Sequence, residues 1–292
     1  MARLIATRST SPELPAGALV RGARLVALAV VIGWSISNVA FHVAAWNLAD
    51  MDAYWNAALR LREGQPLYPA LADASAADVY RYAPWFAWAW VPLTFLPKLA
   101  VGVGWSAILL AATAWALRPL MRPDLTSLAA LMLLGSFLVW AASVGNVQPL
   151  LIAALVHGLE RRSGPVWVGV VASLKAVPIL YALIYVGRGE WLRAATALVV
   201  AALLAAPFLL YDLSRYPAGS GDAPSPLIAI SPLLFGAAVV ALAGLTVWLA
   251  RRGSGLDRWA ASVTVLAALP RITLLDLPQL LVAVRPAQDR GR

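Results

Sequence analysis

The sequence predicts an all-α, polytopic integral membrane protein, a bundle of helices that crosses a bilayer several times. Of its 292 residues, 61% are hydrophobic and only 13% are charged, which is about half the charged fraction of a soluble domain. Several apolar runs reach the roughly 20 residues that a helix needs to cross a bilayer. These runs are continuous and do not alternate, so a membrane β-barrel is excluded.

The N-terminal part of the chain predicts a tail, an anchor and a loop. Residues 1–22 are polar and are expected to form a cytoplasmic tail. Residues 24–46 form the first predicted span, and its length indicates a retained anchor and not a cleaved signal peptide. Residues 47–82, the longest polar stretch, form the first predicted extracytoplasmic loop. Within this loop, residues 52–63 have the pattern of an amphipathic helix that can lie flat on the membrane and that Gly64 ends.

The rest of the chain completes one transmembrane domain, residues 23–284, followed by a short cytoplasmic tail at 285–292. Residues 83–97 are rich in Trp and Pro and are short for a crossing, so we expect them at the membrane interface. Two runs, 165–186 and 259–284, carry charges in the middle and are interpreted as broken pairs that enter the membrane and return. The remaining apolar runs are residues 99–117, 125–143, 149–159, 194–211 and 227–250.

Arginine clusters between the spans predict the orientation. With residues 83–97 on the surface and both broken runs returning, these clusters fall on one side, which the positive-inside rule makes cytoplasmic. If residues 83–97 cross instead, Arg118 and Arg122 fall outside. The net charge of +9 therefore reflects topology, and nucleic acid is not an expected partner. An Arg-rich, Lys-poor composition is typical of GC-rich bacterial genomes, so we expect a bacterial plasma membrane.

Asp50 and Asp52 open the predicted extracytoplasmic loop. Two acids at a helix start often do no more than complement the helix dipole. Their place at the lipid boundary favours a catalytic role, because a carboxylate there can take a proton from an acceptor hydroxyl. Asp50 is the first candidate for this base, and Asp52 is the second. No cofactor is required, although a divalent metal at the pair stays open. With no Cys and two distant His residues, the chain has no disulfide or zinc motif.

Three cations are candidates for binding a phosphate. Lys175 lies in an apolar run near Pro178, where a charge is costly in lipid, so it either snorkels or faces a phosphate in a polar cavity. Arg271 either pairs with Asp276 inside the bundle or joins the same site. Arg81 either belongs to an aromatic belt at the interface or holds a phosphate through paired hydrogen bonds.

Amide and hydroxyl side chains are candidates for binding a sugar or an acceptor. Asn146 and Gln148 lie in a polar turn between two spans. They either cap the turn locally or bind sugar hydroxyls, since an amide offers both donors and acceptors. Tyr54 and Tyr82 flank the acidic and basic candidates and are assigned to the same group.

The order of these motifs resembles that of glycosyltransferase family 87, in the C-type superfamily of integral-membrane glycosyltransferases. The likeness covers about residues 24–284, although the turn at Asn146 and Gln148 has the two amides swapped relative to the family pattern and the chain is shorter than is usual in the family. The matching pieces are Asp50 to Tyr54, Tyr80 to Pro84, Gly145 to Gln148, Lys175 to Pro178, Pro270–Arg271 and Asp276–Leu277.

The resemblance implies a C-type helical bundle and a sugar donor linked to polyprenyl phosphate, typically polyprenyl-phosphate mannose. It also implies a catalytic acid in the first extracytoplasmic loop, the place that Asp50 occupies. The expected reaction is transfer, with inversion, to a hydroxyl of a lipid or glycan acceptor among membrane lipids. Two alternatives stay open: a transporter or flippase of a lipid-linked intermediate, which needs no base, and a non-catalytic membrane subunit. The oligomeric state is not predicted.

Overall fold

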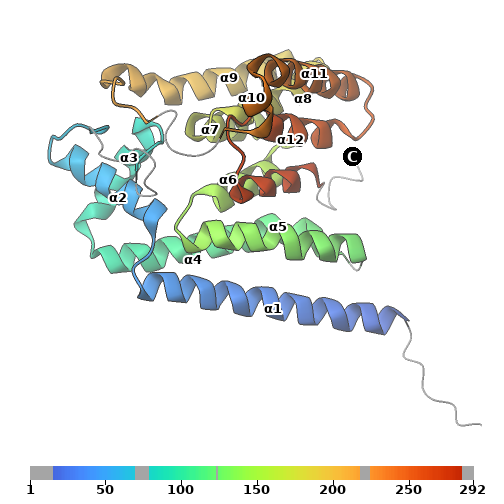
Figure 1. Ribbon diagram of the computed structural model, residues 1–292, viewed down its shortest axis with the longest axis horizontal. Coiled ribbons are helices and arrows are strands. Elements are labelled where there is room, and N and C mark those ends of the chain that lie inside the picture. Colours follow the sequence, from blue (N-terminus) through green and yellow to red (C-terminus); the bar gives the residue numbers. More distant parts are fainter. Residues whose placement is uncertain (1–15, 70–78, 123, 218–223, 285–292) are drawn as a thin grey trace, which may run out of the picture.

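The computed structural model describes residues 16–69, 79–122, 124–217 and 224–284. Over these residues the regular elements are helices, and no strand occurs. Figure 1 shows long helices lying side by side, with α2 (Ala49–Arg62) and α3 (Pro84–Trp90) gathered at one end of the bundle. The predicted all-α, polytopic fold is confirmed. The predicted C-terminal tail, residues 285–292, lies outside the described residues.

Five of the described helices are long and apolar enough to cross a membrane. Each presents large apolar side chains on its outside, such as Leu25, Leu203 and Leu233, as expected of helices that face lipid. The candidate spans are α1 (Ala16–Ala44) from Arg21 onward, α4 (Lys98–Leu117), α5 (Leu125–Ser143), α9 (Trp191–Ala205) with the 3-10 helix η4 (Ala206–Leu210), and α11 (Pro232–Arg251).

The first helix begins earlier than predicted. Residues 16–22, expected in the polar tail, belong to α1. The stretch Ala16–Val20 is apolar and contains no proline or capping residue, so the helix extends back to the residue after Pro15.

Shorter elements fill the interior and the end of the bundle. Helix α2 starts three residues before the predicted position and ends, as expected, before Gly64, whose φ is +69°. The segment 83–97 forms α3 and the 3-10 helix η1 (Val91–Phe95), which are too short to cross. The remaining short helices outside the two broken runs are α6 (Gln148–Gly158), η2 (Arg118–Leu120) and α10 (Pro226–Ile230).

The first broken run forms a helical hairpin of α7 (Gly164–Leu174), η3 (Val177–Tyr181) and α8 (Ala182–Gly187). Its two arms are antiparallel, because the Tyr185 hydroxyl near the end donates to the carbonyl of Leu159 just before the start, at 2.6 Å. Lys175 lies at the tip in extended conformation. Pro178 accounts for the break, since its ring would clash with the carbonyl of Leu174 in a continuous helix.

The second broken run forms a similar hairpin of α12 (Asp257–Ala267) and the 3-10 helix η5 (Leu274–Ala283). The Tyr181 hydroxyl of the first hairpin contacts both arms of the second, at 3.2 Å from Ser262 Oγ and 3.2 Å from Gln279 Oε1. The two hairpins therefore pack against each other, and both return as the sequence predicted.

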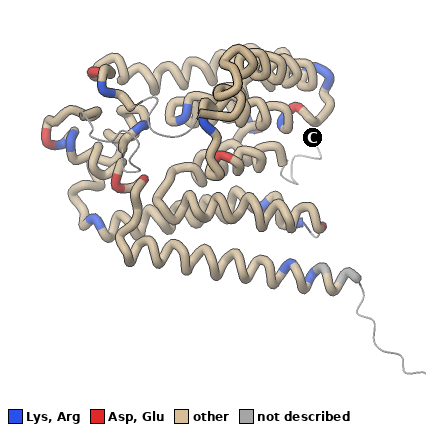
Figure 2. The backbone as a smooth tube through the Cα atoms, viewed as in Figure 1, with Lys and Arg blue, Asp and Glu red and all other residues tan. Residues whose placement is uncertain are grey.

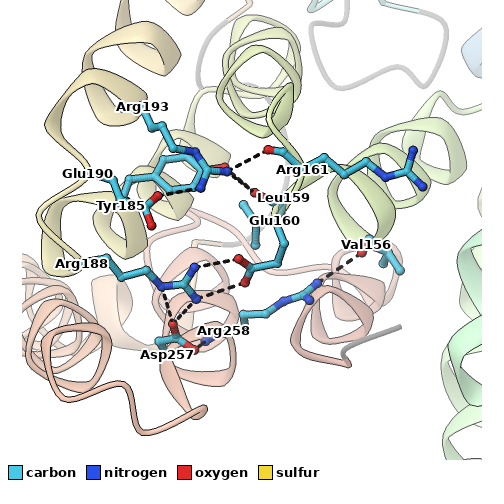
Figure 3. A network of polar contacts seen from close by, with 10 residues as sticks. All are labelled: Val156, Leu159, Glu160, Arg161, Tyr185, Arg188, Glu190, Arg193, Asp257 and Arg258. Atoms are coloured by element: carbon cyan, nitrogen blue, oxygen red, sulfur yellow. Dashed lines mark hydrogen bonds and ion pairs between the residues drawn. The ribbon is translucent and has the colours of Figure 1, made fainter. Parts of the chain in front are cut away.

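A network of ion pairs joins the bases of the two hairpins (Figure 3). The guanidinium of Arg188, after α8, bonds to the two oxygens of Glu160 at 2.7 and 3.1 Å, and its Nε bonds to Asp257 at 3.1 Å. Burial opposes the charged form of Glu160, but the bonds from Arg188 hold the pKa of this carboxyl below its ordinary value of 4.5. Arg258 is wholly buried and donates to the Val156 carbonyl at 3.3 Å. Arg188 thus joins the bases of the two hairpins, and Arg258 connects the base of the second hairpin to α6.

Charges concentrate towards the ends of the long helices, with few in between (Figure 2). The side chains of Lys175 and Asp276, one from each hairpin, meet at 3.8 Å between Nζ and Oδ1. The hairpins are therefore joined by charge at their bases and again near their tips.

Candidate active site

The start of α2 docks on the turn that follows α5. The backbone N–H of Asp50 donates to the carbonyl of Val144 at 3.0 Å. The backbone N–H of Val147 donates to the Tyr54 hydroxyl at 3.2 Å. The first turn of α2 is therefore fixed relative to the turn that carries Asn146.

Gly145 makes this close approach sterically feasible. Its φ is +80°, in the left-handed region that favours glycine. A Cβ at this position would lie 2.8 Å from Met51 Cβ and 3.0 Å from the Met51 backbone nitrogen. The Trp105 indole N–H also donates to the Gly145 carbonyl at 2.8 Å. Residues larger than glycine would push α2 away from the turn.

Asp50 is a carboxyl whose proton affinity is tuned by its surroundings. It keeps partial contact with the surface, yet enough protein surrounds it that burial raises its pKa from 3.8 to about 6. A hydrogen bond from Asn146 and the charges of Lys175 and Arg81 oppose this rise. The structure thus brings together four residues that the sequence named separately. A carboxyl with a pKa near 6 is suited to exchange protons near neutral pH.

Asn146 and Gln148 behave differently from each other. The Asn146 Oδ1 accepts the backbone N–H of Gln148 at 2.8 Å, which is the local cap that the sequence left open. The Gln148 side chain is 0% exposed. Within the described part of the chain, neither its Oε1 nor its Nε2 has a hydrogen-bond partner. A buried amide without partners is unfavourable, so this amide is free to bind a polar group.

Tyr54, in α2, and Tyr82, in the loop before α3, contact each other. The Tyr54 hydroxyl donates to the Tyr82 hydroxyl at 3.2 Å. Burial, followed by the neighbouring phenol and the Asp50 carboxylate, raises the pKa of Tyr54, and burial with Asp50 raises that of Tyr82. Both phenols therefore stay protonated. The Tyr54 hydroxyl already bonds to Tyr82 and to the Val147 N–H, so Tyr82 is the better placed of the two to meet a substrate.

Lys175 lies between two acids. Its ammonium is 3.8 Å from Asp276 Oδ1 and its charge acts on Asp50. The other Asp276 oxygen accepts bonds from the Thr273 backbone N–H at 3.0 Å and from the Thr273 hydroxyl at 2.8 Å. Asp276, for which an ion pair with Arg271 was one of two open readings, thus has Lys175 and Thr273 among its contacts. Arg271 is half-buried in the link between α12 and η5, and the charges that act on Asp50 are those of Lys175 and Arg81.

Asp52 lies apart from Asp50. Its Oδ1 is 2.6 Å from the ammonium of Lys98, at the start of α4. Two residues apart on a helix, the acids face different sides. They do not converge on one point, so this arrangement gives no support for a metal held by the pair. Over the described residues, no group of three or more His, Cys, Asp or Glu side chains is arranged to hold a metal ion.

Arg81 is held by the loop around it. Its Nη1 donates to the Val79 carbonyl at 3.2 Å, and the Tyr216 hydroxyl donates to the Arg81 carbonyl at 2.9 Å. Tyr68 stacks on Phe208 with ring centroids 6.2 Å apart. These aromatic contacts join the loop between α2 and α3 to η4 and to the segment after it.

A pocket of about 340 Å³ opens beside these residues. Three of its lining residues, Ala83, Leu174 and Ala176, are chain neighbours of Tyr82 and Lys175. Apart from Ile179, small or aromatic residues line the rest of the wall, among them Ser173, Ala201, Ala202, Ala205, Phe208 and Tyr216. The wall is mostly apolar, and it includes part of α9, a candidate membrane span.

Several residues that shape this site could not be recognised from the sequence. Lys98 reads as an ordinary charge at the start of a span, yet it binds Asp52. Trp105 reads as a lipid-facing aromatic, yet it bonds to the turn at Gly145. The glycine in a polar turn was a usable signal, because such positions often need a positive φ.

The fold and the site define a multi-pass helical membrane protein with an acid, cations and amides gathered beside an apolar pocket. The family model of glycosyltransferase family 87 matches residues 80–218. This match supports membership of glycosyltransferase family 87, the family that the motifs resemble, and that family implies a membrane glycosyltransferase. The matched range includes Arg81, Asn146 and Lys175, whereas Asp50 and Asp276 lie outside it. No curated protein and no solved structure matches the chain.

Proposed function

We propose that the protein transfers a sugar, mannose in the first instance, from a polyprenyl-phosphate donor to a hydroxyl of a lipid or glycan acceptor. We place this reaction at the extracytoplasmic face of a bacterial plasma membrane. The observation that carries the proposal is the convergence of the Asp50 carboxyl with Asn146, Lys175 and Arg81. An acid and two cations in one place match the needs of a base and of a phosphate leaving group.

In this mechanism Asp50 takes the proton of the acceptor hydroxyl. The hydroxyl oxygen forms a bond to the anomeric carbon while the bond from that carbon to the phosphate oxygen breaks. The electron pair leaves with the phosphate, and attack from the opposite face inverts the anomeric centre. Lys175 and Arg81, with Arg271, stabilise the charge that develops on the phosphate. Because the pKa of Asp50 is about 6, the carboxylate form predominates at neutral pH.

The apolar pocket supports a lipid-linked donor. Leu174 and Ala176 on its wall flank Lys175, so a phosphate at the ammonium would place its lipid chain along that wall. Ala201 and Ala205 leave room there because their side chains are small. The start of an isoprenoid chain would lie in this pocket and the remainder in the membrane.

Gln148 and Tyr82 are the proposed contacts for sugar or acceptor hydroxyls. The unpaired amide of Gln148 offers two donors and an acceptor. Asn146 serves the acid more directly, by its hydrogen bond to Asp50. Tyr54 holds Tyr82 in place through the bond between their hydroxyls.

The test compares wild type with Asp50→Asn in membranes supplied with radiolabelled polyprenyl-phosphate mannose. Wild type is expected to produce a labelled glycolipid, and Asp50→Asn is expected to bind the donor without transfer. Glu63→Gln is the matched control, because Glu63 is an exposed acid at the other end of α2. Full transfer by Asp50→Asn would contradict the mechanism. Movement of the donor across the membrane that does not depend on Asp50 would instead favour a flippase.

A further inference from the structure

We propose that Trp46, Lys98 and Asp52 form a clamp that docks the start of α2 on α4 and positions the Asp50 carboxyl. Asp52 is then a positioning residue and not a second base. The role of the clamp in transfer rests on the proposed function, whereas its geometry is a property of the described residues alone.

Trp46 occupies a backbone position that usually requires glycine. At the end of α1 the N–H of Trp46 bonds to Val43 at 3.2 Å and the N–H of Asn47 bonds to His42 at 2.8 Å. This is the Schellman pattern, in which the residue at the position of Trp46 is left-handed and commonly glycine. Trp46 has a φ of +52°, which is strained for a side chain of its size. The indole must therefore provide contacts that glycine lacks.

The indole lies against α4 and under a cation. The ammonium of Lys98 is 4.8 Å from the centre of the Trp46 ring, within the range of a cation–π interaction. A Cβ at Gly102 would lie 3.4 Å from Trp46 Cη2 and 3.2 Å from Leu48 Cδ1. The turn between α1 and α2 is therefore packed closely on the first turns of α4.

Lys98 connects this turn to α2 itself. Its ammonium is 2.6 Å from Asp52 Oδ1, so one cation contacts the end of α1 through Trp46 and the first turn of α2 through Asp52. Asp50 belongs to that same turn. A shift of the turn would move the Asp50 carboxyl relative to Asn146, and a misplacement of about 1 Å can lower a rate about a hundredfold.

The ion pair is suited to positioning more than to stabilising the fold. The side chains of Lys98 and Asp52 are 34% and 21% exposed, although the Oδ1 atom that faces Lys98 is itself buried. Ion pairs that keep contact with water contribute less to stability than fully buried pairs. A comparable ion pair lies at the start of α9, between Glu190 and Arg193. It has the same separation of 2.6 Å, and its side chains are 33% and 26% exposed. Glu190→Gln is therefore the control for loss of an equivalent pair.

The first experiment measures transfer of mannose from polyprenyl-phosphate mannose. Asp52→Asn and Lys98→Met are expected to lower kcat about ten- to a hundredfold with an unchanged KM for the donor, and Glu190→Gln is expected to change neither. The double variant Asp52→Asn with Lys98→Met is expected to be about as active as either single variant, because both substitutions remove the same contact between the helices. A base at position 52 would act independently of Lys98, so losses that multiply in the double variant would overturn the proposal. Full activity of Asp52→Asn would overturn it as well.

The second experiment does not depend on transfer. The chain has no native cysteine, so Asp50→Cys gives a single thiol whose reaction with a water-soluble maleimide reports how well the start of α2 is held. Adding Lys98→Met or Trp46→Gly is expected to speed labelling several-fold, although glycine relieves the strained backbone at position 46. Adding Glu190→Gln is expected to leave the rate unchanged. Unchanged labelling in the first two double variants refutes the clamp. Faster labelling in these double variants, together with a protein with native Asp50 that transfers no sugar from the donor, refutes the proposed function and leaves the clamp standing.

Discussion

The burial of Asp50 couples activity to stability, and Asp50→Asn is expected to separate the two. In the unfolded chain this carboxyl loses its proton near pH 3.8, whereas in the folded protein it keeps the proton up to about pH 6. The folded state therefore binds more protons between these values, and the free energy of unfolding falls as the pH rises through this window. Asparagine carries no charge and avoids this loss.

The size of the effect follows from the pKa. At 1.36 kcal/mol for each pH unit, a rise from 3.8 to about 6 costs up to about 3 kcal/mol above pH 6. This is an upper bound, because the carboxyl keeps partial contact with water and solvent screens its charge. At pH 8, Asp50→Asn is expected to be more stable than wild type by up to that amount. Below pH 4 the two proteins are expected to be equally stable.

The assay is thermal unfolding of detergent-extracted protein between pH 4 and pH 8. Each kcal/mol corresponds to roughly 2–4 °C in Tm for chains of about this size, so a difference of several degrees should open between the two pH values. Glu63→Gln should follow wild type throughout, since Glu63 is exposed. A lower Tm for Asp50→Asn than for wild type at pH 8 would contradict this prediction. A difference in Tm that does not change with pH would contradict it as well.

Three further substitutions test other parts of the site. Lys175→Met removes a charge that lowers the pKa of Asp50, so the acidic limb of the plot of kcat/KM against pH should move to higher pH. Gly145→Ala places a Cβ 2.8 Å from Met51 Cβ at a φ of +80°, which should destabilise the protein by about 1–3 kcal/mol in thermal unfolding and lower the transfer rate. Arg188→Met removes the cation that lies between Glu160 and Asp257 at the hairpin bases and should cost about 3–5 kcal/mol by the same measurement.

Each of these substitutions has a control. Gly104→Ala is the control for Gly145, because a Cβ at Gly104 would meet no atom within 4 Å. Arg252→Met is the control for Arg188, because Arg252 is exposed. If a variant and its control lost equal stability, the contacts described at Gly145 or Arg188 would not be the cause of the loss. For Lys175→Met, an acidic limb that stays in place would show that this cation does not act on Asp50.

The spans were predictable because the membrane imposes a simple physical rule. A chain in lipid must satisfy its backbone hydrogen bonds internally, so apolar length alone indicates helices. Residues 99–117 and 125–143 correspond closely to α4 (Lys98–Leu117) and α5 (Leu125–Ser143). The hairpins were also predictable, because Lys175 beside Pro178 combines a charge costly in lipid with a residue that breaks a helix.

The packing of the two hairpins was harder to predict from the sequence. Nothing in the spacing of Arg188, Glu160 and Asp257 indicates that they share one network, because their contact depends on how three separate helices meet. Asp276 shows the same problem. Its sequence neighbour Arg271 was the natural candidate for an ion pair, yet its carboxylate contacts Lys175, which lies far away in the chain.

The choice between Asp50 and Asp52 shows where sequence reasoning stops. Both acids lie in the first turn of α2, so helix periodicity predicts that they face different sides without saying which side faces the site. That choice depends on the direction in which α2 leaves α1, and the left-handed backbone of Trp46 sets that direction. Tryptophan carries no turn signal, so the reversal could not be read from the residue type. With the turn in this conformation, Asp52 forms an ion pair with Lys98 and Asp50 accepts a hydrogen bond from Asn146. The assignment of the base therefore depends on a strained residue four positions away, and Trp46→Gly tests whether the turn keeps its direction without the indole.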